Sequence, residues 1–306
     1  MTQIYYHPDE KQVTVEDTET ILKVSLRSGI PHTHVCGGKA RCSTCRVMIV
    51  DGLENLNPRN EREQTMAERL KFGPNIRLAC QTTFQGEIRL RRLVIDDEDI
   101  KLDDQTAPGR EEGEAVGSEK RIAILFSDVR GFTTFSEALP AYDVIHSLNR
   151  YFQQIGQIIS NHGGYIDNYM GDGIMALFGV DNSKDAPLRA VRAGLDMLRV
   201  VDESIRPYFE SIYAKVFDIG IGIHYGEAVV GTIGARNRKT QTAIGDSVNF
   251  ASRIESANKE AGTRLLISDD TYAAVQDDVR IGKTTRMMVK GKSGEYMLYE
   301  VIGLSD

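Results

Sequence analysis

Three of the chain's four cysteines lie within ten residues of one another, in the stretch HVCGGKARCSTCRV, and no other feature constrains the fold as strongly. Cys36, Cys42 and Cys45 have the spacing C-x5-C-x2-C, and Cys80 follows much later, in RLACQT. Thiolates are soft ligands that select zinc or iron with sulfide. The beginning of the chain, MTQIYYHPDEKQ, has neither a basic start nor an apolar core. We therefore expect a cytoplasmic, reducing location, where structural disulfides are rare.

The spacing of the cysteines discriminates between zinc and an iron–sulfur cluster. A structural zinc commonly takes two C-x2-C pairs, and only Cys42 and Cys45 form such a pair here. The offset Cys36 and the distant Cys80 instead favour four ligands wrapped around two irons. Small residues in the loop let backbone N–H groups approach the sulfides, namely Gly37, Gly38, Ala40 and Ser43. A zinc site, or four reduced structural cysteines, is the alternative.

Residues 1–95 resemble the adrenodoxin-type branch of the 2Fe-2S ferredoxins. In that branch the ligand loop carries C-x5-C-x2-C, and the last ligand stands in a segment like LACQT. The resemblance implies a β-grasp fold and a 2Fe-2S cluster held by Cys36, Cys42, Cys45 and Cys80. A redox partner for the cluster is a further implication.

An acidic linker separates this domain from a second one. With 306 residues the chain is long enough for two domains, each with its own core. From Asp96 the sequence DDEDIKLDDQTAPGREEGEAVGSEK is rich in Asp, Glu and Gly, so we predict a linker at 96–119 between domains at 1–95 and 120–306. No run of about 18 apolar residues favours membrane insertion. The net charge of −7 argues against nucleic-acid binding.

Hydrophobic periodicity predicts an α+β fold for the second domain. RIAILF has the pattern of a buried strand, a helix follows over 143–162, and YIDNYMGDGIMALF is a hairpin. A helix over 185–201, strands in VFDIGIGIHY and EAVVGTIG, and a helix over 246–261 come next. The order βαββαβ predicts one sheet with helices on one face.

Two aspartates are predicted to meet in this sheet. Asp128 ends the first strand, IAILFSD, and Asp172 occupies the turn of the hairpin. The first and third strands of a βαββαβ sheet are antiparallel neighbours, so the two carboxylates should converge. Carboxylates without sulfur or imidazole company suit Mg²⁺ or Mn²⁺, which usually arrive with a nucleoside triphosphate. Gly131 gives the backbone freedom to turn, so that the amides of Phe132 and Thr133 can face phosphate oxygens.

A further group of polar residues lies on a helix near the end of the domain. DSVNFASRIES places Asn249 and Arg253 one helical turn apart on the same face. The second domain resembles the catalytic domain of the class III adenylyl and guanylyl cyclases. The resemblance rests on this helix together with SDVRGFTTF, the MGDG turn and VKGK at 289–292. The resemblance covers about residues 120–302. It implies a ferredoxin-like fold that works as a homodimer, with each active site built from both protomers.

The resemblance also implies a role for each residue. One chain would bind two Mg²⁺ or Mn²⁺ ions through Asp128, Asp172 and the backbone carbonyl of Val129. The partner chain would contribute Asn249 for the ribose, Arg253 for the pentacovalent transition state, and Lys290 and Arg238 for the phosphates. The implied reaction converts ATP to 3′,5′-cyclic AMP and diphosphate.

Two positions of the family's pattern recognise the purine. Here they are Asn168, where a lysine is common, and Thr242, in QTAIGDSVNF. An asparagine both donates and accepts hydrogen bonds, so it can face adenine or guanine. We expect ATP as the substrate, because guanylyl cyclases of the family usually place a glutamate at the first position. A guanylate cyclase or an enzyme of broad specificity is the alternative.

For the whole chain, the leading hypothesis is an adenylate cyclase that responds to the redox state or iron occupancy of its cluster domain. A second hypothesis is a redox sensor whose cyclase-like part binds a nucleotide but does no chemistry. A third is an electron carrier, which explains the first 95 residues only.

Overall fold

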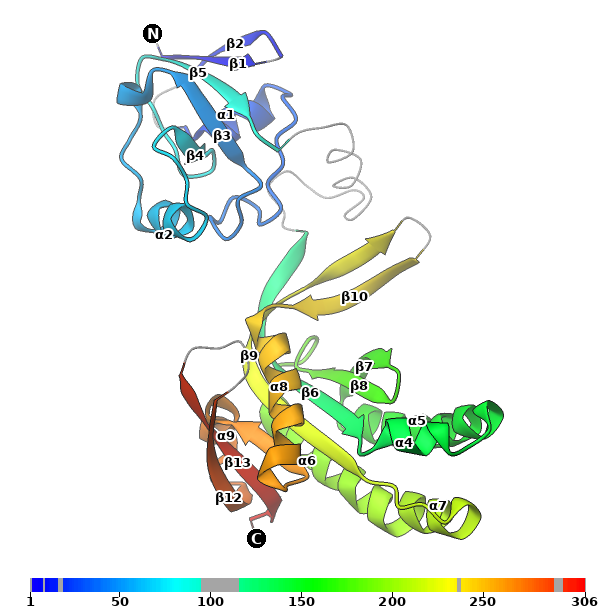
Figure 1. Ribbon diagram of the computed structural model, residues 1–306. Coiled ribbons are helices and arrows are strands. Elements are labelled where there is room, and N and C mark those ends of the chain that lie inside the picture. The colour runs from blue at the N-terminus through cyan, green and yellow to red at the C-terminus, as the bar shows by residue number, and fades with distance from the viewer. Residues whose placement is uncertain are drawn as a thin grey trace. The chain divides into compact units, whose positions relative to one another are not determined.

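The computed structural model of the chain describes residues 2–7, 9–15, 19–94, 116–235, 238–288 and 294–305 (Figure 1). The chain divides into two compact units, Met1–Ser118 with Thr232–Thr240, and Glu119–Gly231 with Gln241–Asp306. The predicted linker at 96–119 lies mostly outside the described residues, so its bounds stay a prediction. Within the described ranges, no helix combines the length and the apolar character that crossing a bilayer requires.

The first unit is built on a five-stranded mixed sheet in the order β2-β1-β5-β3-β4. Its strands are β1 (Gln3–His7), β2 (Lys11–Thr14), β3 (Arg46–Asp51), β4 (Ile76–Leu78) and β5 (Glu87–Arg92). β1 and β5 are parallel, and the other pairs are antiparallel. Helix α1 (Ile21–Arg27) buries Ile21 and Val24 in the core of this unit, in agreement with the predicted β-grasp fold. A 3-10 turn (Leu53–Asn55) and helix α2 (Glu61–Arg69) complete the unit.

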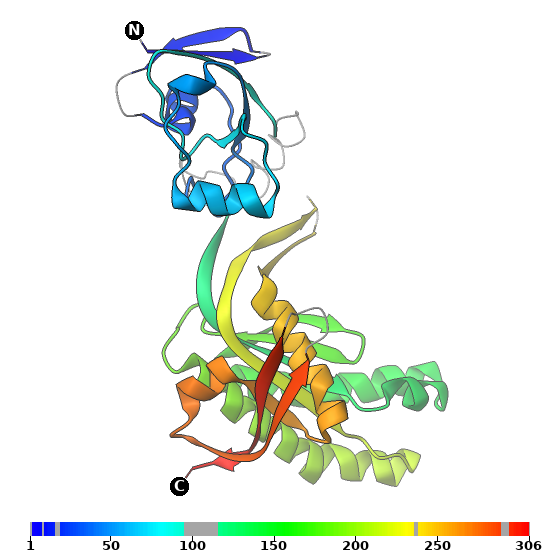
Figure 2. The ribbon, with the colours of Figure 1, turned by 60° about the vertical axis from the view of Figure 1, so that its left-hand side comes forward.

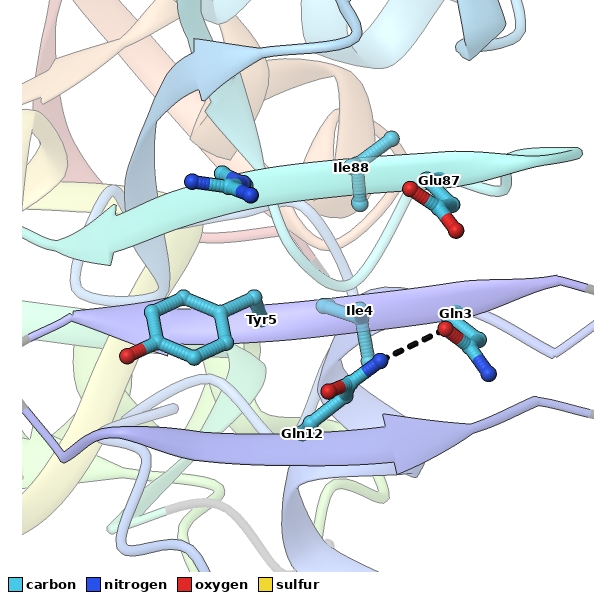
Figure 3. A pocket seen from close by; sticks show the side chains of 7 residues that line it. Gln3, Ile4, Tyr5, Gln12, Glu87 and Ile88 are labelled. Carbon is cyan, nitrogen blue, oxygen red and sulfur yellow. Dashed lines mark hydrogen bonds between the residues drawn. The ribbon is translucent and has the colours of Figure 1, made fainter.

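One face of this sheet is polar and the other is apolar. Figure 3 shows β1 between β2 and β5, with Gln12 Nε2 donating to Gln3 Oε1 at 2.6 Å. Ile4 and Ile88 are paired across β1 and β5, and both are buried in the core. The hollow along these strands measures about 60 Å³, well below the roughly 300 Å³ of small ligand pockets. This surface is therefore no candidate for a cofactor site.

Helix α2 begins later than the sequence pattern predicts. Pro58 and Asn57 predict a helix from Pro58 with Asn57 as its N-cap, but the cap is Asn60, whose side chain accepts from the Glu63 N–H at 3.0 Å. Asn57 Oδ1 instead accepts from the Thr83 N–H at 2.7 Å. A contact with a distant segment thus determines the use of Asn57, and local spacing does not reveal it.

A buried ion pair connects α2 to the segment that leads to Cys80. The Glu63 side chain is fully buried, and its Oε2 lies 2.9 Å from Arg77 Nη2 on β4. Glu63 Oε1 also accepts from the backbone N–H of Leu78 at 2.7 Å. Hydrogen bonds to both carboxylate oxygens offset the cost of burying these charges.

The second unit contains the predicted βαββαβ core within a larger sheet. The strand order is β12-β13-β11-β9-β6-β8-β7, and β10 pairs with β9. The strands are β6 (Gly117–Val129), β7 (Gly164–Met170), β8 (Gly173–Phe178), β9 (Ile219–Ala235), β10 (Arg238–Ile244), β11 (Leu265–Ser268), β12 (Val279–Met288) and β13 (Glu295–Leu304). The two strands expected in VFDIGIGIHY and EAVVGTIG are one strand, β9, which curves in both views (Figures 1 and 2).

Helices cover both faces of this sheet, which corrects the expectation of helices on one face. The helices are α4 (Phe132–Glu137), α5 (Ala141–Asn161), α6 (Ala186–Val200), the π-helical turn η2 (Val201–Ile205), α7 (Arg206–Tyr213), α8 (Asp246–Ala261) and α9 (Asp269–Val275). Leu265 and Ile267 of β11 belong to the core that contains α5 and α6, whereas Leu266 belongs to the core under α8. A strand with consecutive apolar residues needs cover on both sides.

Replacing Glu63 by glutamine is expected to destabilise the first unit by about 3–5 kcal/mol, because the buried Arg77 guanidinium loses its counter-charge. Denaturant unfolding followed by circular dichroism measures this loss. Glu19→Gln is the control, because it breaks a more exposed ion pair, Glu19–Arg27 at 2.7 Å, and should cost no more than about 1 kcal/mol. Equal losses in the two variants would contradict the assignment.

Candidate functional site

The structure brings the four predicted cluster ligands together as two pairs of thiols. Cys36 is hydrogen-bonded to Cys42, and Cys45 to Cys80. Cys45 and Cys80 are buried, and the other two are half-buried. The hydrogen bond from Cys42 lowers the pKa of Cys36 to about 5, and that from Cys45 lowers the pKa of Cys80 to about 7. The pKa of each donor thiol is raised by the same bond, so one thiolate forms readily in each pair.

This arrangement fits a binuclear cluster better than a single zinc ion. In the described part of the chain, no three His, Cys, Asp or Glu side chains gather closely enough to hold one metal ion. Two irons need two thiolates each, and two pairs are what the loop and Cys80 provide. The Ala79 N–H donates to the Cys45 carbonyl at 3.1 Å, which joins the two segments that carry the ligands. Gln81 Nε2 lies 3.4 Å from Cys80 Sγ as a hydrogen-bond donor.

The second predicted site begins where β6 pairs with β8. The strands are antiparallel, as predicted, and Ser127 is paired with Ile174. Asp128, the next residue of β6, therefore lies beside the turn that holds Asp172, and the two carboxyl groups are hydrogen-bonded to each other. Gly171 opens the turn with φ of 67°, a conformation that favours glycine.

The electrostatics of this pair fit a hard divalent cation. Burial and the neighbouring Asp128 charge raise the pKa of Asp172 to about 6. Burial also raises the pKa of Asp128. The backbone N–H of Val129 is a hydrogen-bond partner of both carboxyl groups and favours their charged forms. Two oxygen ligands that repel each other at close range are the donor set that Mg²⁺ or Mn²⁺ stabilises.

An ion pair that the sequence analysis did not identify connects the end of β6 to α8. Arg130 Nη1 lies 3.2 Å from Glu255 Oε1, and the Glu255 side chain is only 9% exposed. The guanidinium lies against Gly220 of β9, where a Cβ would overlap it. At Gly222 a Cβ would overlap the backbone nitrogen of Glu255, so α8 rests directly on β9. The glycines in DIGIGIH, two residues apart, were the available sequence signal.

The predicted ribose and transition-state residues lie on α8. Asn249 is exposed and Arg253 is half-buried, whereas Phe250 and Ile254 on the same helix are buried. Within the described part of the chain, neither polar side chain has a hydrogen bond or ion pair to Asp128 of β6 or to Asp172 in the turn between β7 and β8.

The purine positions differ in their contacts. Thr242 Oγ1 donates to Asp167 Oδ2 at 2.6 Å, whereas Asn168 is exposed. Phe132 packs against the core and Thr133 is exposed, both at the start of α4. Arg238 opens β10, and Lys290 lies outside the described residues. The sequence analysis missed Asp167, because it treated β7 as a regular strand.

Comparison with known families identifies both parts of the chain. Residues 115–303 match the family described as the adenylate and guanylate cyclase catalytic domain. This match covers more than half of the chain, and the chain belongs to this family. Residues 4–85 match the 2Fe-2S iron-sulfur cluster binding domain. The predicted fusion is thereby confirmed, and its cofactors are a 2Fe-2S cluster and Mg²⁺ or Mn²⁺.

Curated relatives of the chain include proteins named adenylate cyclase. An adenylate cyclase of Anabaena cylindrica is 38% identical over 194 residues, which are 61% of this chain and 38% of the relative. A terminal-differentiation specific adenylate cyclase of Dictyostelium discoideum is 38% identical over 66% of this chain, but only 10% of the relative is covered. This chain thus matches well under half of either relative.

Solved structures share the cyclase fold. The guanylyl cyclase Cya2 is 37% identical, with a TM-score of 0.58 over 62% of this chain and 95% of that chain. The adenylyl cyclase CyaB from P. aeruginosa is 32% identical, with a TM-score of 0.56 over 61% of this chain and 95% of that chain.

Protein purified without oxygen is expected to contain about two irons and two sulfides per chain. Cys80→Ser should lose most of both, because one iron keeps a single thiolate. Ser43→Ala, in the same loop, is the matched control and should retain them. Metal analysis and sulfide determination give the result, and stoichiometric zinc without sulfide would refute the cluster.

Proposed function

We propose that the chain is an adenylate cyclase that forms 3′,5′-cyclic AMP and diphosphate from ATP at the interface of a homodimer. The hydrogen-bonded carboxyl pair of Asp128 and Asp172 carries this proposal, because it supplies hard oxygen ligands in a chain of the cyclase family. In the reaction, the ribose 3′-oxygen forms a bond to the α-phosphorus and the hydroxyl proton leaves. The bond from this phosphorus to the oxygen that bridges to the β-phosphate breaks.

Each residue has a part that follows from its chemistry. Asp128, Asp172 and the Val129 carbonyl would hold Mg²⁺ or Mn²⁺, which polarises the phosphates and makes the 3′-hydroxyl more acidic. From the other protomer, Arg253 would stabilise charge on the transferring phosphate, and Asn249 would orient the ribose. The phosphate contacts would be completed by the amides of Phe132 and Thr133 and by the side chains of Lys290 and Arg238.

The choice of ATP over GTP depends on Thr242 and Asn168. An amide at position 168 can donate to N1 of adenine, and a threonine oxygen can accept from its 6-amino group. Adenylate cyclases among the relatives support this choice, and the similar guanylyl cyclase structure keeps GTP as the alternative.

The first test offers equimolar ATP and GTP with Mn²⁺ and identifies the cyclic product by mass spectrometry. Cyclic AMP should dominate. Asp172→Asn should lower turnover about 100-fold or more, because several kcal/mol of charge stabilisation are lost. Asp181→Asn, at an exposed position after β8, is the control and should keep the activity. Cyclic GMP as the main product would establish GTP as the substrate. The absence of any cyclic product would contradict the proposal and favour a redox sensor that binds a nucleotide without converting it.

We further propose that the 2Fe-2S domain regulates this activity in the cytoplasm. Support comes from the Val116 N–H, which donates to the Val35 carbonyl at 2.9 Å, next to Cys36. Strand β6 starts at the following residue and continues to Asp128 and Val129. The hydrogen bond at Val116 and the metal-binding residues are therefore joined by one continuous strand.

A redox partner also has access to the cluster in this proposal. A cleft of about 440 Å³ is bordered by residues of α1, by Gly37 and Gly38, and by Cys80. Its size is within the range of specific binding clefts, and it reaches a cluster ligand directly. An electron donor could therefore change the state of the cluster without unfolding the domain.

Cyclase rates of oxidised, reduced and cluster-free protein are expected to differ about fivefold or more, the lower end of common allosteric coupling. Val116→Pro removes the N–H donor and should diminish this difference while the cluster absorbance persists. Val116→Ala keeps the donor and should behave like the unchanged protein. Identical rates in all three cluster states would reject regulation and favour a separate electron-transfer role.

A further inference from the structure

One hydrogen bond at the purine positions involves a residue that the family pattern does not identify. Thr242 Oγ1 on β10 donates to Asp167 Oδ2 on β7 at 2.6 Å. Both side chains are half-buried. The second oxygen, Asp167 Oδ1, is buried and has no hydrogen-bond partner in the described part of the chain. The hydrogen bond from the Thr242 hydroxyl is therefore the interaction that the structure gives to the Asp167 carboxylate.

A β-bulge in β7 brings Asp167 to the same side of the sheet as Asn168. Ile166 is paired with Ala176, and Asn168 with the preceding residue of β8, Met175. Asp167 is thus the extra residue of the bulge. Ile166 and Ala176 face the core of α5 and α6, whereas Met175 faces the core that α8 covers. Since successive side chains alternate, Asp167 points to the α8 side, and the bulge adds Asn168 to that side.

The number of hydrogens on the hydroxyl determines what Thr242 can offer to a base. A threonine hydroxyl has one hydrogen, and here it is given to Asp167. The remaining lone pairs of Oγ1 can only accept. The 6-amino group of adenine donates to such an oxygen, whereas the 6-oxo group of guanine is itself an acceptor and would meet lone pairs.

We propose that Asp167 sets the preference for adenine by holding the Thr242 hydroxyl in the orientation in which it can only accept. This inference rests on the proposed function, in which Thr242 faces the purine. Asp167 is a positioning residue, because it acts through Thr242 and makes no contact with the base itself. Asn168 lies on the same side of the sheet and is left to donate to N1 of adenine.

The test is the ratio of kcat/KM for ATP to that for GTP in the full-length protein. In Asp167→Ala the hydroxyl rotates freely and can donate to the 6-oxo group of guanine. The ratio should fall about tenfold, which is the effect of one hydrogen bond. The change should appear in KM more than in kcat, because the purine edge is remote from the reacting atoms.

Two further variants separate this role from a general loss of structure. Tyr165→Phe removes from β7 a buried hydroxyl that has no hydrogen-bond partner among the described residues, and it leaves the Thr242 bond intact, so the ratio should not change. In a Thr242→Val background, Asp167→Ala should change the ratio no further, because the hydroxyl that it orients is absent. Asp167→Leu keeps about the size of the side chain but offers no oxygen to the Thr242 hydroxyl, so it should also lower the ratio and provides a test if the alanine variant fails to fold.

The outcomes distinguish this inference from the proposed function. If the unchanged protein prefers GTP, the proposed substrate is wrong and the inference falls with it. If it prefers ATP and both Asp167 variants keep that preference, the inference alone is wrong. An undiminished effect of Asp167→Ala in the Thr242→Val background would equally overturn it, since Asp167 would then act by another route.

Discussion

The antiparallel pairing of β6 with β8 is the constraint on which the catalytic half of the chain depends. It places Ser127 opposite Ile174, and this register alone brings Asp128 to the turn that holds Asp172. A shift by one residue would send the buried side chains of both strands to the wrong faces. Because both strands are buried over most of their length, such a shift is excluded by the core. The buried apolar residues of β6 and β8 thus fix the positions of the Asp128 and Asp172 carboxyl groups at the edge of the core.

Features with local causes were predictable from the sequence. The spacing of the cysteines predicted that Cys36, Cys42, Cys45 and Cys80 gather, and the structure places their thiols in two pairs. The convergence of Asp128 and Asp172 followed from strand order alone. Helix α8 begins and ends where predicted, between Gly245 and Gly262, because glycine caps leave a local signal.

Features that depend on contacts between distant segments were not predictable in the same way. Asn57 has the spacing of an N-cap, but the Thr83 N–H binds its side chain, and Asn60 starts α2 instead. The bulge at Asp167 changes which side chains share a face, and no pattern within YIDNYM reveals an unpaired residue. The position of α8 on the opposite face from α6 depends on which side of β9 leaves room for it, which a one-dimensional pattern does not contain.

Gly222 allows α8 to pack against β9 through main-chain atoms. Contacts through side chains can give way as rotamers change, whereas two main chains in contact have no such freedom. Since the backbone of Glu255 lies against β9 at this glycine, no rotamer change can alter the spacing between α8 and β9 there. Arg253 is two residues from this contact, so its position relative to β9 is set by main-chain packing and not by side-chain rotamers. Because Gly222 has no side chain, the sheet and the helix are in direct main-chain contact at this point.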